Sequence, residues 1–225
     1  MKSYDWGNQI EYLKRSIRLY YNDDYIEFLI EKVWKIHSPV HILDFGCGFG
    51  HLGLRLLPFL PEGSKYVGID ASAKLIELAR GVFQDLEYNV EFFVGDIHTF
   101  HFEQKYVMVV CHGVLLHMAD PVFILKRMSD CVKEGGKVVA FEPHWISSHA
   151  SFHFEGIEQS VAIPLGPLQK LFEEDAKSTG KDGNIGLKLP LYLNRLGLHD
   201  VECRVSDKVN ILDPESNSET AQMLL

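Results

Sequence analysis

A glycine-rich stretch headed by an acidic residue is the part of the sequence best suited to hold a nucleotide-like ligand. Asp44 ends an apolar run of β-forming residues, and Gly46, Gly48 and Gly50 follow at alternate positions before an apolar helical pattern resumes at Leu52. Glycine permits the backbone angles of a tight turn, and its missing Cβ lets backbone N–H groups approach a ligand. The stretch therefore predicts a ligand-binding turn between a strand and a helix.

Two registers of this stretch indicate two classes of cofactor. Gly48-x-Gly50-x-x-Gly53 matches the dinucleotide fingerprint, and Asp70 lies 20 residues beyond Gly50, where an acid would bind a ribose hydroxyl. In the other register Asp44 comes first, and its carboxylate would repel a diphosphate but attract a cationic ammonium or sulfonium group. We favour the cationic ligand and keep an NAD(P)-dependent oxidoreductase as an alternative.

Further reactive side chains follow other short apolar runs. These runs span residues 65–70, 90–94, 106–110 and 137–141, with helical patterns between them. The side chains at or just after the ends of the runs are Asp70, Asp96, Cys111, His112, His117, Glu142 and His144. Strands that alternate with helices at short spacing predict a parallel sheet with helices on both faces. Ligands bind such sheets beyond the carboxyl ends of the strands, where all these residues are expected.

The remaining segments frame this core. Residues 8–37 hold two helical patterns, residues 146–187 interrupt the alternation with a helix near 168–177, and a sixth strand is expected at 201–212. We expect one α/β domain with a Rossmann-like, doubly wound, mostly parallel sheet. Its parts would be an N-terminal helical segment at 1–38, a cofactor-binding core at 39–145, a substrate-cover insertion at 146–187, and a C-terminal helix, strand and polar tail at 188–225.

The order of these motifs over residues 23–145 resembles the class I S-adenosylmethionine-dependent methyltransferases, and within them the small-molecule branch. Residues 44–50 are similar to the first motif of that family. Gly95-Asp96 after the third strand and Gly135-Gly136-Lys137 before the fifth are not expected of a dehydrogenase. The resemblance implies S-adenosylmethionine as cofactor and in-line transfer of its methyl group to a small-molecule acceptor. The seventh strand usual in the family has no counterpart here, so a non-catalytic S-adenosylmethionine-binding module is a second alternative.

The resemblance also implies a role for each motif residue. The loop of Gly46, Cys47, Gly48 and Gly50 would surround the methionyl portion of the cofactor, with Asp44 near its ammonium group. Asp70 would accept hydrogen bonds from both ribose hydroxyls, a role that suits an acceptor-only carboxylate. The other residues expected beside the cofactor are Ala71, Asp96, Ile97, Cys111, His112 and Tyr21.

Three residues are candidates for the transfer step itself. His117 titrates near neutral pH and could take a proton from the acceptor, although the same position is also typical of a structural histidine in the turn after the fourth strand. Glu142 and His144 follow the fifth strand and are expected to face the acceptor. A base is needed only when the nucleophile must lose a proton, so alignment in a dry cavity is the main contribution of the protein.

Composition narrows the expected partners. A net charge of −9 argues against nucleic acid, no apolar run is long enough to span a bilayer, and no signal peptide opens the sequence. The intervals between His144, His149 and His153 fit no compact zinc signature, and His51 is grouped with the surface or locally satisfied histidines. We expect a cytoplasmic enzyme with no bound metal and no membrane partner, and a homodimer is a possible assembly. The four cysteines, Cys47, Cys111, Cys131 and Cys203, are expected to be free and buried.

Overall fold

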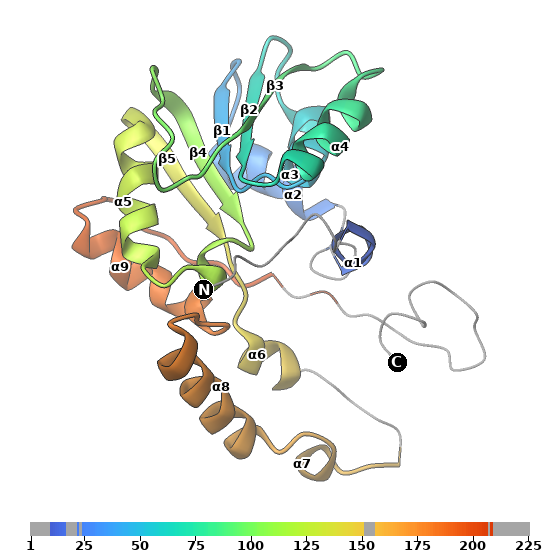
Figure 1. The fold of residues 1–225 in the computed structure, drawn as a ribbon, viewed down its shortest axis with the longest axis vertical. Helices are drawn as coiled ribbons and strands as arrows, with labels where there is room; N and C mark the ends of the chain where they lie inside the picture. Colours follow the sequence, from blue (N-terminus) through green and yellow to red (C-terminus); the bar gives the residue numbers. More distant parts are fainter. Residues whose placement is uncertain (1–9, 17–21, 23, 151–155, 207, 209–225) are drawn as a thin grey trace.

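Five parallel strands form one sheet in the part of the chain that the structure describes. The structure is a computed structural model, and it describes residues 10–16, 22, 24–150, 156–206 and 208 (Figure 1). The strands are β1 (His41–Phe45), β2 (Lys65–Asp70), β3 (Asn89–Val94), β4 (Tyr106–His112) and β5 (Val132–Phe141). They lie in the order β3-β2-β1-β4-β5, so the chain reverses its direction across the sheet between β1 and β4. The expected parallel, Rossmann-like sheet is confirmed.

The central strand β1 is apolar on both faces because helices cover both. Leu43 pairs with Val67 of β2 on one side and with Val109 of β4 on the other. Ile42 and Leu43, which point to opposite faces, are both fully buried. The continuous apolar run that predicted a buried strand is therefore explained by the two-sided cover.

The helices divide between the two faces of the sheet (Figure 1). One face packs against α2 (Asp24–Phe28), the π-helical η3 (Leu29–Trp34), α3 (His51–Leu56) and α4 (Ala73–Phe83). The other packs against α5 (Pro121–Cys131) and α9 (Leu189–Arg195). The doubly wound arrangement is confirmed. The remaining elements near the core are α1 (Ile10–Ser16) and the 3₁₀ turns η4 (Leu57–Phe59) and η5 (Leu115–His117).

Two helices begin at the positions that their capping residues predicted. The Ser72 hydroxyl accepts a hydrogen bond from the Leu75 N–H at 3.4 Å at the start of α4. The Asp120 carboxylate accepts from the Phe123 N–H at 2.9 Å, and Pro121 occupies the first position of α5. Local sequence signals therefore set where these helices start.

The insertion after β5 lies beyond the carboxyl ends of the strands (Figure 1). It contains α6 (Trp145–Ala150), α7 (Gln159–Ala162), α8 (Leu165–Thr179) and the 3₁₀ turn η6 (Ile185–Lys188). The helix expected at 168–177 is present as α8, which ends at Gly180 with φ of 72°. This position agrees with the predicted cover over the ligand site, and that role remains a prediction.

Two elements differ from the sequence prediction. β5 begins at Val132 rather than 137, and its pairing shifts register between Tyr106↔Val132 and Met108↔Lys137, so Gly135-Gly136 lie in an irregular part of the strand. Residues 201–206 form no strand, and residues 207 and 209–212 lie outside the described residues. Cys203 and Val205 lie within the segment expected as the sixth strand, and both are exposed because the segment does not join the sheet.

Candidate functional site

The glycine loop after β1 adopts a conformation that requires glycine at three positions. Gly46, Gly48 and Gly50 have φ of 71°, 56° and 81°, in the left-handed region. A Cβ added at Gly46 would lie 2.6 Å from the Val114 side chain, and one at Gly50 would lie 2.7 Å from Phe83. A Cβ added at Gly48 would meet nothing within 4 Å. The outer glycines pack against protein, and the middle one leaves its backbone open to a ligand.

Asp70 at the end of β2 lies across this loop. Its Oδ2 accepts a hydrogen bond from the Gly48 N–H at 3.0 Å, and its Oδ1 accepts from the Ser72 N–H at 2.8 Å. Burial raises the pKa of this carboxyl, and the two N–H donors act in the opposite direction. Each carboxylate oxygen has a second lone pair, so Asp70 can still accept from ligand hydroxyls. The structure thus brings together the loop and the acid that the sequence singled out.

Asp44 is a buried carboxylate with one oxygen that has no partner. It is 1% exposed, and its Oδ2 accepts a hydrogen bond from the Tyr66 hydroxyl. Among the residues that the structure describes, no group donates a hydrogen bond to its Oδ1. Burial raises the pKa of Asp44 to about 7, against the lowering effect of the Tyr66 hydrogen bond. An unpaired buried acceptor costs about 1–3 kcal/mol, so this oxygen is ready to receive a donor.

His51 lies beside the candidate site, which the sequence did not predict. It was expected at the surface or satisfied locally, but its Nε2 is buried and finds no hydrogen-bond partner within the described part of the chain. Burial, with smaller effects of the nearby His112 and Arg55, lowers the pKa of His51 to about 3. The prediction was wrong because the burial of the His51 ring depends on residues that pack on it from other parts of the chain. The one signal in the sequence was its position directly after Gly50, at the first residue of α3.

Rings form a continuous row at the carboxyl ends of β1, β4 and β5. His51 lies between Phe49 and His112, with ring centroids 6.0 and 6.3 Å away, and Phe141 lies 5.8 Å beyond His112. Trp34 of η3 continues the row at 6.2 Å from Phe141. Burial lowers the pKa of His112 to about 4, so both imidazoles in the row are neutral at pH near 7.

Glu142, expected to face an acceptor, binds the backbone of the turn after β4. Its Oε1 accepts hydrogen bonds from the Val114 and Leu115 N–H groups at 2.8 Å each, and Oε2 accepts from Leu116 at 3.2 Å. The buried thiol of Cys111, 3.7 Å from Oε1, donates a weak fourth hydrogen bond. Burial raises the pKa of Glu142 to about 7, although the N–H donors lower it.

The two candidate histidines have different surroundings. His117 ends η5, and burial, with a smaller effect of Lys181, lowers its pKa to about 4. The insertion reaches the same turn, because the Asp182 N–H donates to the Leu116 carbonyl at 3.1 Å. His144 lies at the start of α6, where its Nδ1 accepts from the Ser147 N–H at 3.2 Å. The structure thus places His117 beside the insertion, while His144 caps a helix.

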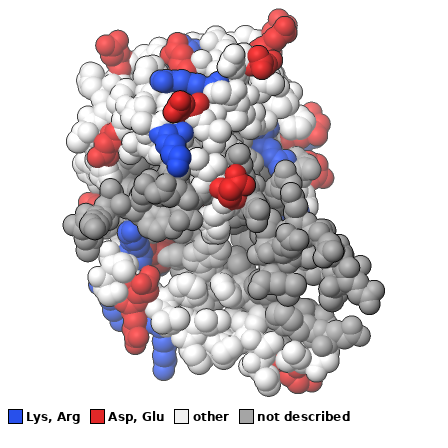
Figure 2. Space-filling model, turned by 45° about the vertical axis from the view of Figure 1, so that its right-hand side comes forward, with Lys and Arg blue, Asp and Glu red and all other residues white. Residues whose placement is uncertain are grey.

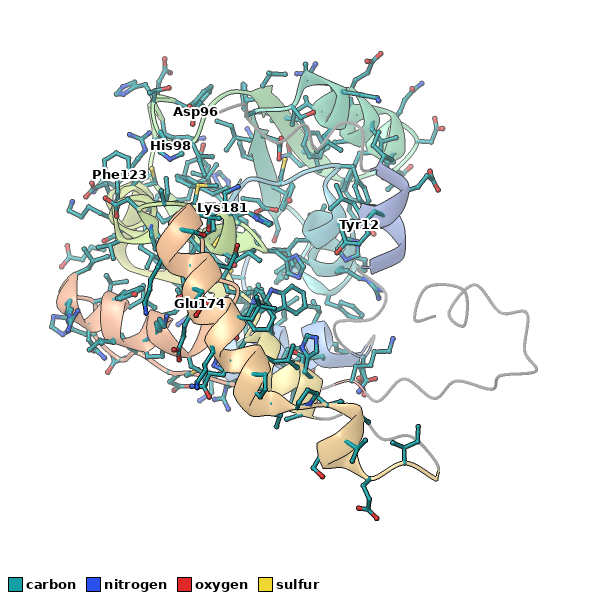
Figure 3. The ribbon with its side chains drawn as sticks, turned by 60° about the horizontal axis from the view of Figure 1, so that its bottom comes forward. Tyr12, Asp96, His98, Phe123, Glu174 and Lys181 are labelled. Carbon is teal, nitrogen blue, oxygen red and sulfur yellow. The ribbon has the colours of Figure 1, made fainter. Side chains whose placement is uncertain are left out.

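The end of β3 forms an exposed polar cluster. Asp96 Oδ1 accepts from the His98 N–H at 2.8 Å and lies 2.7 Å from His98 Nδ1. These contacts lower the pKa of Asp96. The His98 ring stacks on Phe123 at 6.1 Å, and Figure 3 shows Asp96, His98 and Phe123 together, with Lys181 on the α8 side. Ile97 is buried and Ala71 is exposed, while Tyr21 lies outside the described residues.

Other sequence expectations concern metals, membranes, charge and thiols. Within the described ranges, no three His, Cys, Asp or Glu side chains could hold a metal ion, and no helix there has the length and apolarity to cross a bilayer. On the face shown in Figure 2, Lys and Arg of the described residues are interspersed with Asp and Glu. Cys47, Cys111 and Cys131 are buried and free as expected, but Cys203 is exposed because its segment does not join the sheet.

Comparison with known proteins identifies a family for most of this region. The family described as "Methyltransferase domain" matches residues 36–178. The ubiquinone biosynthesis O-methyltransferase of Coxiella burnetii is 30% identical over 99 residues, which cover 44% of this chain and 41% of that protein. A 37.1 kDa protein of transposon TN4556 in Streptomyces fradiae is 37% identical over 107 residues, covering 47% and 30%. The chain thus spans less than half the length of these curated relatives.

A solved structure shares the fold. An S-adenosylmethionine-dependent methyltransferase from Clostridium acetobutylicum superimposes with a TM-score of 0.52 at 20% identity, covering 67% of this chain and 65% of that one. At this identity the likeness shows the fold alone.

Proposed function

Since the chain belongs to the methyltransferase domain family, we propose that it transfers the methyl group of S-adenosylmethionine to a small-molecule acceptor. Methyltransferases of this family use S-adenosylmethionine as their methyl donor. One observation carries the proposal for this chain. The open backbone of Gly48, the Asp70 carboxylate that accepts its N–H, and the buried Asp44 meet at the carboxyl edge beside the switch point of the sheet.

The polar groups at this edge fit the chemistry of that cofactor. The Asp44 Oδ1 has no donor, and an ammonium group is a donor of opposite charge. Neutral His51 with its proton on Nε2 would donate a hydrogen bond to a carboxylate. An α-amino acid carries both an ammonium and a carboxylate group. Asp70 retains acceptor capacity for two ribose hydroxyls, so the three residues suit the methionyl and ribose portions.

The chemistry asks little of the protein beyond placement. When bound, the cofactor supplies a methyl group already activated by its sulfonium. Asp44 and Asp70 would hold the methionyl and ribose portions of the donor, and the row of rings that includes His112 would exclude water from the reacting side. Alignment of this kind is worth about 7–11 kcal/mol of barrier. His117, neutral because burial lowers its pKa to about 4, would accept a proton only from an acceptor that loses one during transfer.

A small molecule is the acceptor that the available observations favour. The name of the Coxiella relative specifies O-methylation in ubiquinone biosynthesis, which has a small-molecule substrate. The net charge of −9 and the interspersed charges of Figure 2 do not offer a phosphate backbone a basic surface on that face. Glu142 and His144 remain proposed neighbours of the acceptor, with their present hydrogen bonds made to the protein.

Calorimetric titration with S-adenosylhomocysteine tests the cofactor. We expect one-to-one binding that falls by about 100-fold in Asp70→Ala, because two charge-assisted hydrogen bonds are lost. Asp85→Ala, which removes an exposed carboxylate just after α4, should bind normally. NADH in place of S-adenosylhomocysteine should not bind. The opposite preference would favour the oxidoreductase alternative.

Turnover is tested separately with S-adenosylmethionine and a panel of phenols, amines and carboxylic acids. We expect release of S-adenosylhomocysteine with at least one of these acceptors. Tight cofactor binding without turnover on any acceptor would instead support the non-catalytic binding module.

A further inference from the structure

We propose that Glu142 is a positioning residue, whose carboxylate holds the turn after β4 against the glycine loop and thereby sets the affinity for the cofactor. The inference rests on the proposed function, because it concerns the S-adenosylmethionine site. Glu142 would act on the affinity for the cofactor without touching the cofactor itself. It would differ in this from Asp70, whose carboxylate is expected to bind the ligand directly.

The grip of Glu142 on the turn is multiple and specific. Three successive N–H groups, from Val114, Leu115 and Leu116, donate to the two carboxylate oxygens at 2.8, 2.8 and 3.2 Å. They open the 3₁₀ turn η5, where N–H groups have no partner within the turn itself. Gly113 is tied to the same strand, because its N–H donates to the Phe141 carbonyl at 2.8 Å. The end of β5 therefore fixes the path of the chain that leaves β4.

Val114 carries this constraint to the glycine loop. It is 7% exposed, and its Cγ2 lies only 2.6 Å from the point where a Cβ on Gly46 would stand. Gly46 is held from the other side, since its N–H donates to the Ile69 carbonyl at 2.8 Å. The loop thus fits between β2 and Val114. A shift of Val114 by a few tenths of an ångström would loosen the loop that presents Gly48.

The same turn connects to the acceptor side. The N–H of Leu116 is bound by Glu142, and its carbonyl accepts from the Asp182 N–H of the insertion at 3.1 Å. His117 follows directly and ends the turn. One carboxylate therefore sets the position of the cofactor loop and of the proposed proton acceptor together.

The grip depends on the charge of Glu142. Ionised, the carboxylate is acceptor-only and can take all three N–H groups, whereas the protonated form points an O–H at donors and loses an acceptor site. Burial raises the pKa of Glu142 to about 7, so both forms occur near neutral pH. The titratable group in contact with Glu142 is Cys111 on β4, on which Asp44 of β1 also acts. His112 ends β4, His117 ends the turn that Glu142 binds, and His144 follows Glu142 by two residues. All of them are retained in Glu142→Gln, so the difference between wild type and this variant isolates Glu142.

The experiment compares wild type, Glu142→Gln, Val114→Ala and the double variant by calorimetric titration with S-adenosylhomocysteine from about pH 6 to about pH 8.5. At about pH 8 we expect Glu142→Gln to weaken binding by about tenfold, since a coupling of 1–3 kcal/mol corresponds to about 5–150-fold. Wild-type affinity should fall toward pH 6 more steeply than that of Glu142→Gln. If Val114 transmits the effect, the double variant should lose less than the product of the single losses.

Glu134→Gln is the matched control, because Glu134 is an exposed glutamate of the same strand. It should leave affinity and pH profile unchanged. A Glu142→Gln protein that melts at a lower temperature yet keeps the wild-type affinity and pH profile would reduce Glu142 to a structural role and overturn the inference. If Asp70→Ala also leaves affinity unchanged, the cofactor assignment fails as well. Loss in Asp70→Ala alone leaves the cofactor assignment standing and removes only the role of Glu142.

Discussion

At the scale of single residues, burial disfavours the charged forms of the ionisable groups of the candidate site. The pKa values of Asp44 and Glu142 are raised to about 7, and those of His51, His112 and His117 are lowered to about 3, 4 and 4. Desolvation is the largest cause in each case. A zwitterionic ligand would place an ammonium group beside the carboxyls and a carboxylate beside the imidazoles. Binding is therefore expected to change their protonation.

Asp44→Asn should make the free protein more stable at high pH while weakening cofactor binding. The folded pKa of Asp44 is about 7 against an ordinary 3.8, so the folded state binds the extra proton, and stability falls as pH rises through this window. Asparagine keeps an oxygen for the Tyr66 hydroxyl without the buried charge. We expect a gain of about 2 kcal/mol at about pH 8, or about 4–8 °C in melting temperature, and little gain at about pH 4.

The measurement is thermal unfolding across pH, followed by titration with S-adenosylhomocysteine at about pH 8. Asp85→Asn, on an exposed carboxylate, is the control and should not change either quantity. An equal shift in melting temperature at both pH values would show that charge is not the cause.

His51→Phe should lower the affinity for S-adenosylhomocysteine by about tenfold and leave the affinity for 5′-methylthioadenosine unchanged. Phenylalanine keeps the ring beside His112 but removes the N–H that would meet a carboxylate, and a hydrogen bond to a charged group is worth about 1.5–3 kcal/mol. 5′-Methylthioadenosine has no amino acid portion, so the difference between the two ligands measures that contact. His51→Gln, which offers an amide N–H, should recover part of the loss, and exposed His37→Phe should have no effect.

At the scale of elements, the sequence predicted the strands, helix starts and helices that depend on neighbouring residues only. The buried run of β1, the caps at Ser72 and Asp120 and the helix α8 follow from burial periodicity and side-chain hydrogen bonds, and the structure confirms them. β5 starts earlier than predicted because pairing with β4 extends it through two glycines, and pairing is not visible in one strand alone. The hydrogen bonds of three N–H groups to Glu142 and the burial of the His51 Nε2 likewise depend on residues distant in sequence.

Gly46→Ala should destabilise the fold more than Gly48→Ala. Both positions have positive φ, which costs an L-residue about 1–2 kcal/mol, but only the alanine Cβ at Gly46 would clash with Val114. We expect losses of about 3 kcal/mol and about 1 kcal/mol, respectively, in the free energy of unfolding by urea. Combining Gly46→Ala with Val114→Ala should recover part of the larger loss. Equal losses at the two glycines would contradict the close packing of Val114 on the loop.

At the scale of the whole molecule, the strand order places the site. Because the chain leaves β1 toward β2 and β3 and then crosses to β4 and β5, the loops after β1 and β4 diverge at the switch point and leave room for a ligand. The alternation of strands and helices was enough to predict this edge. The path of residues 201–206 was not, because a pattern of alternate apolar residues does not say whether a sheet face is available.

S-adenosylhomocysteine should raise the melting temperature of the whole chain. A ligand present at about 100 times its dissociation constant stabilises the folded state by about 2.7 kcal/mol, which corresponds to about 5–11 °C for a chain of this size. Differential scanning fluorimetry with the ligand, with NADH and with buffer alone measures the shift. Asp70→Ala, with its expected binding about 100-fold weaker, should show a much smaller shift with the ligand than the wild type does. A shift with NADH would contradict the cofactor assignment.

The insertion meets the core through main-chain hydrogen bonds and through the buried side chain of Ile185. The N–H groups of Asp182 and Gly186 donate to the carbonyls of Leu116 and Pro143 at 3.1 and 3.0 Å. Each of these bonds joins main-chain atoms, so they constrain side-chain identity little. We propose that the edge with the glycine loop holds the methyl donor and that α6–α8 cover the acceptor. On that proposal, we expect related proteins to keep the donor edge constant while the side chains of α6–α8 vary, so that new acceptors are gained without rebuilding the donor site.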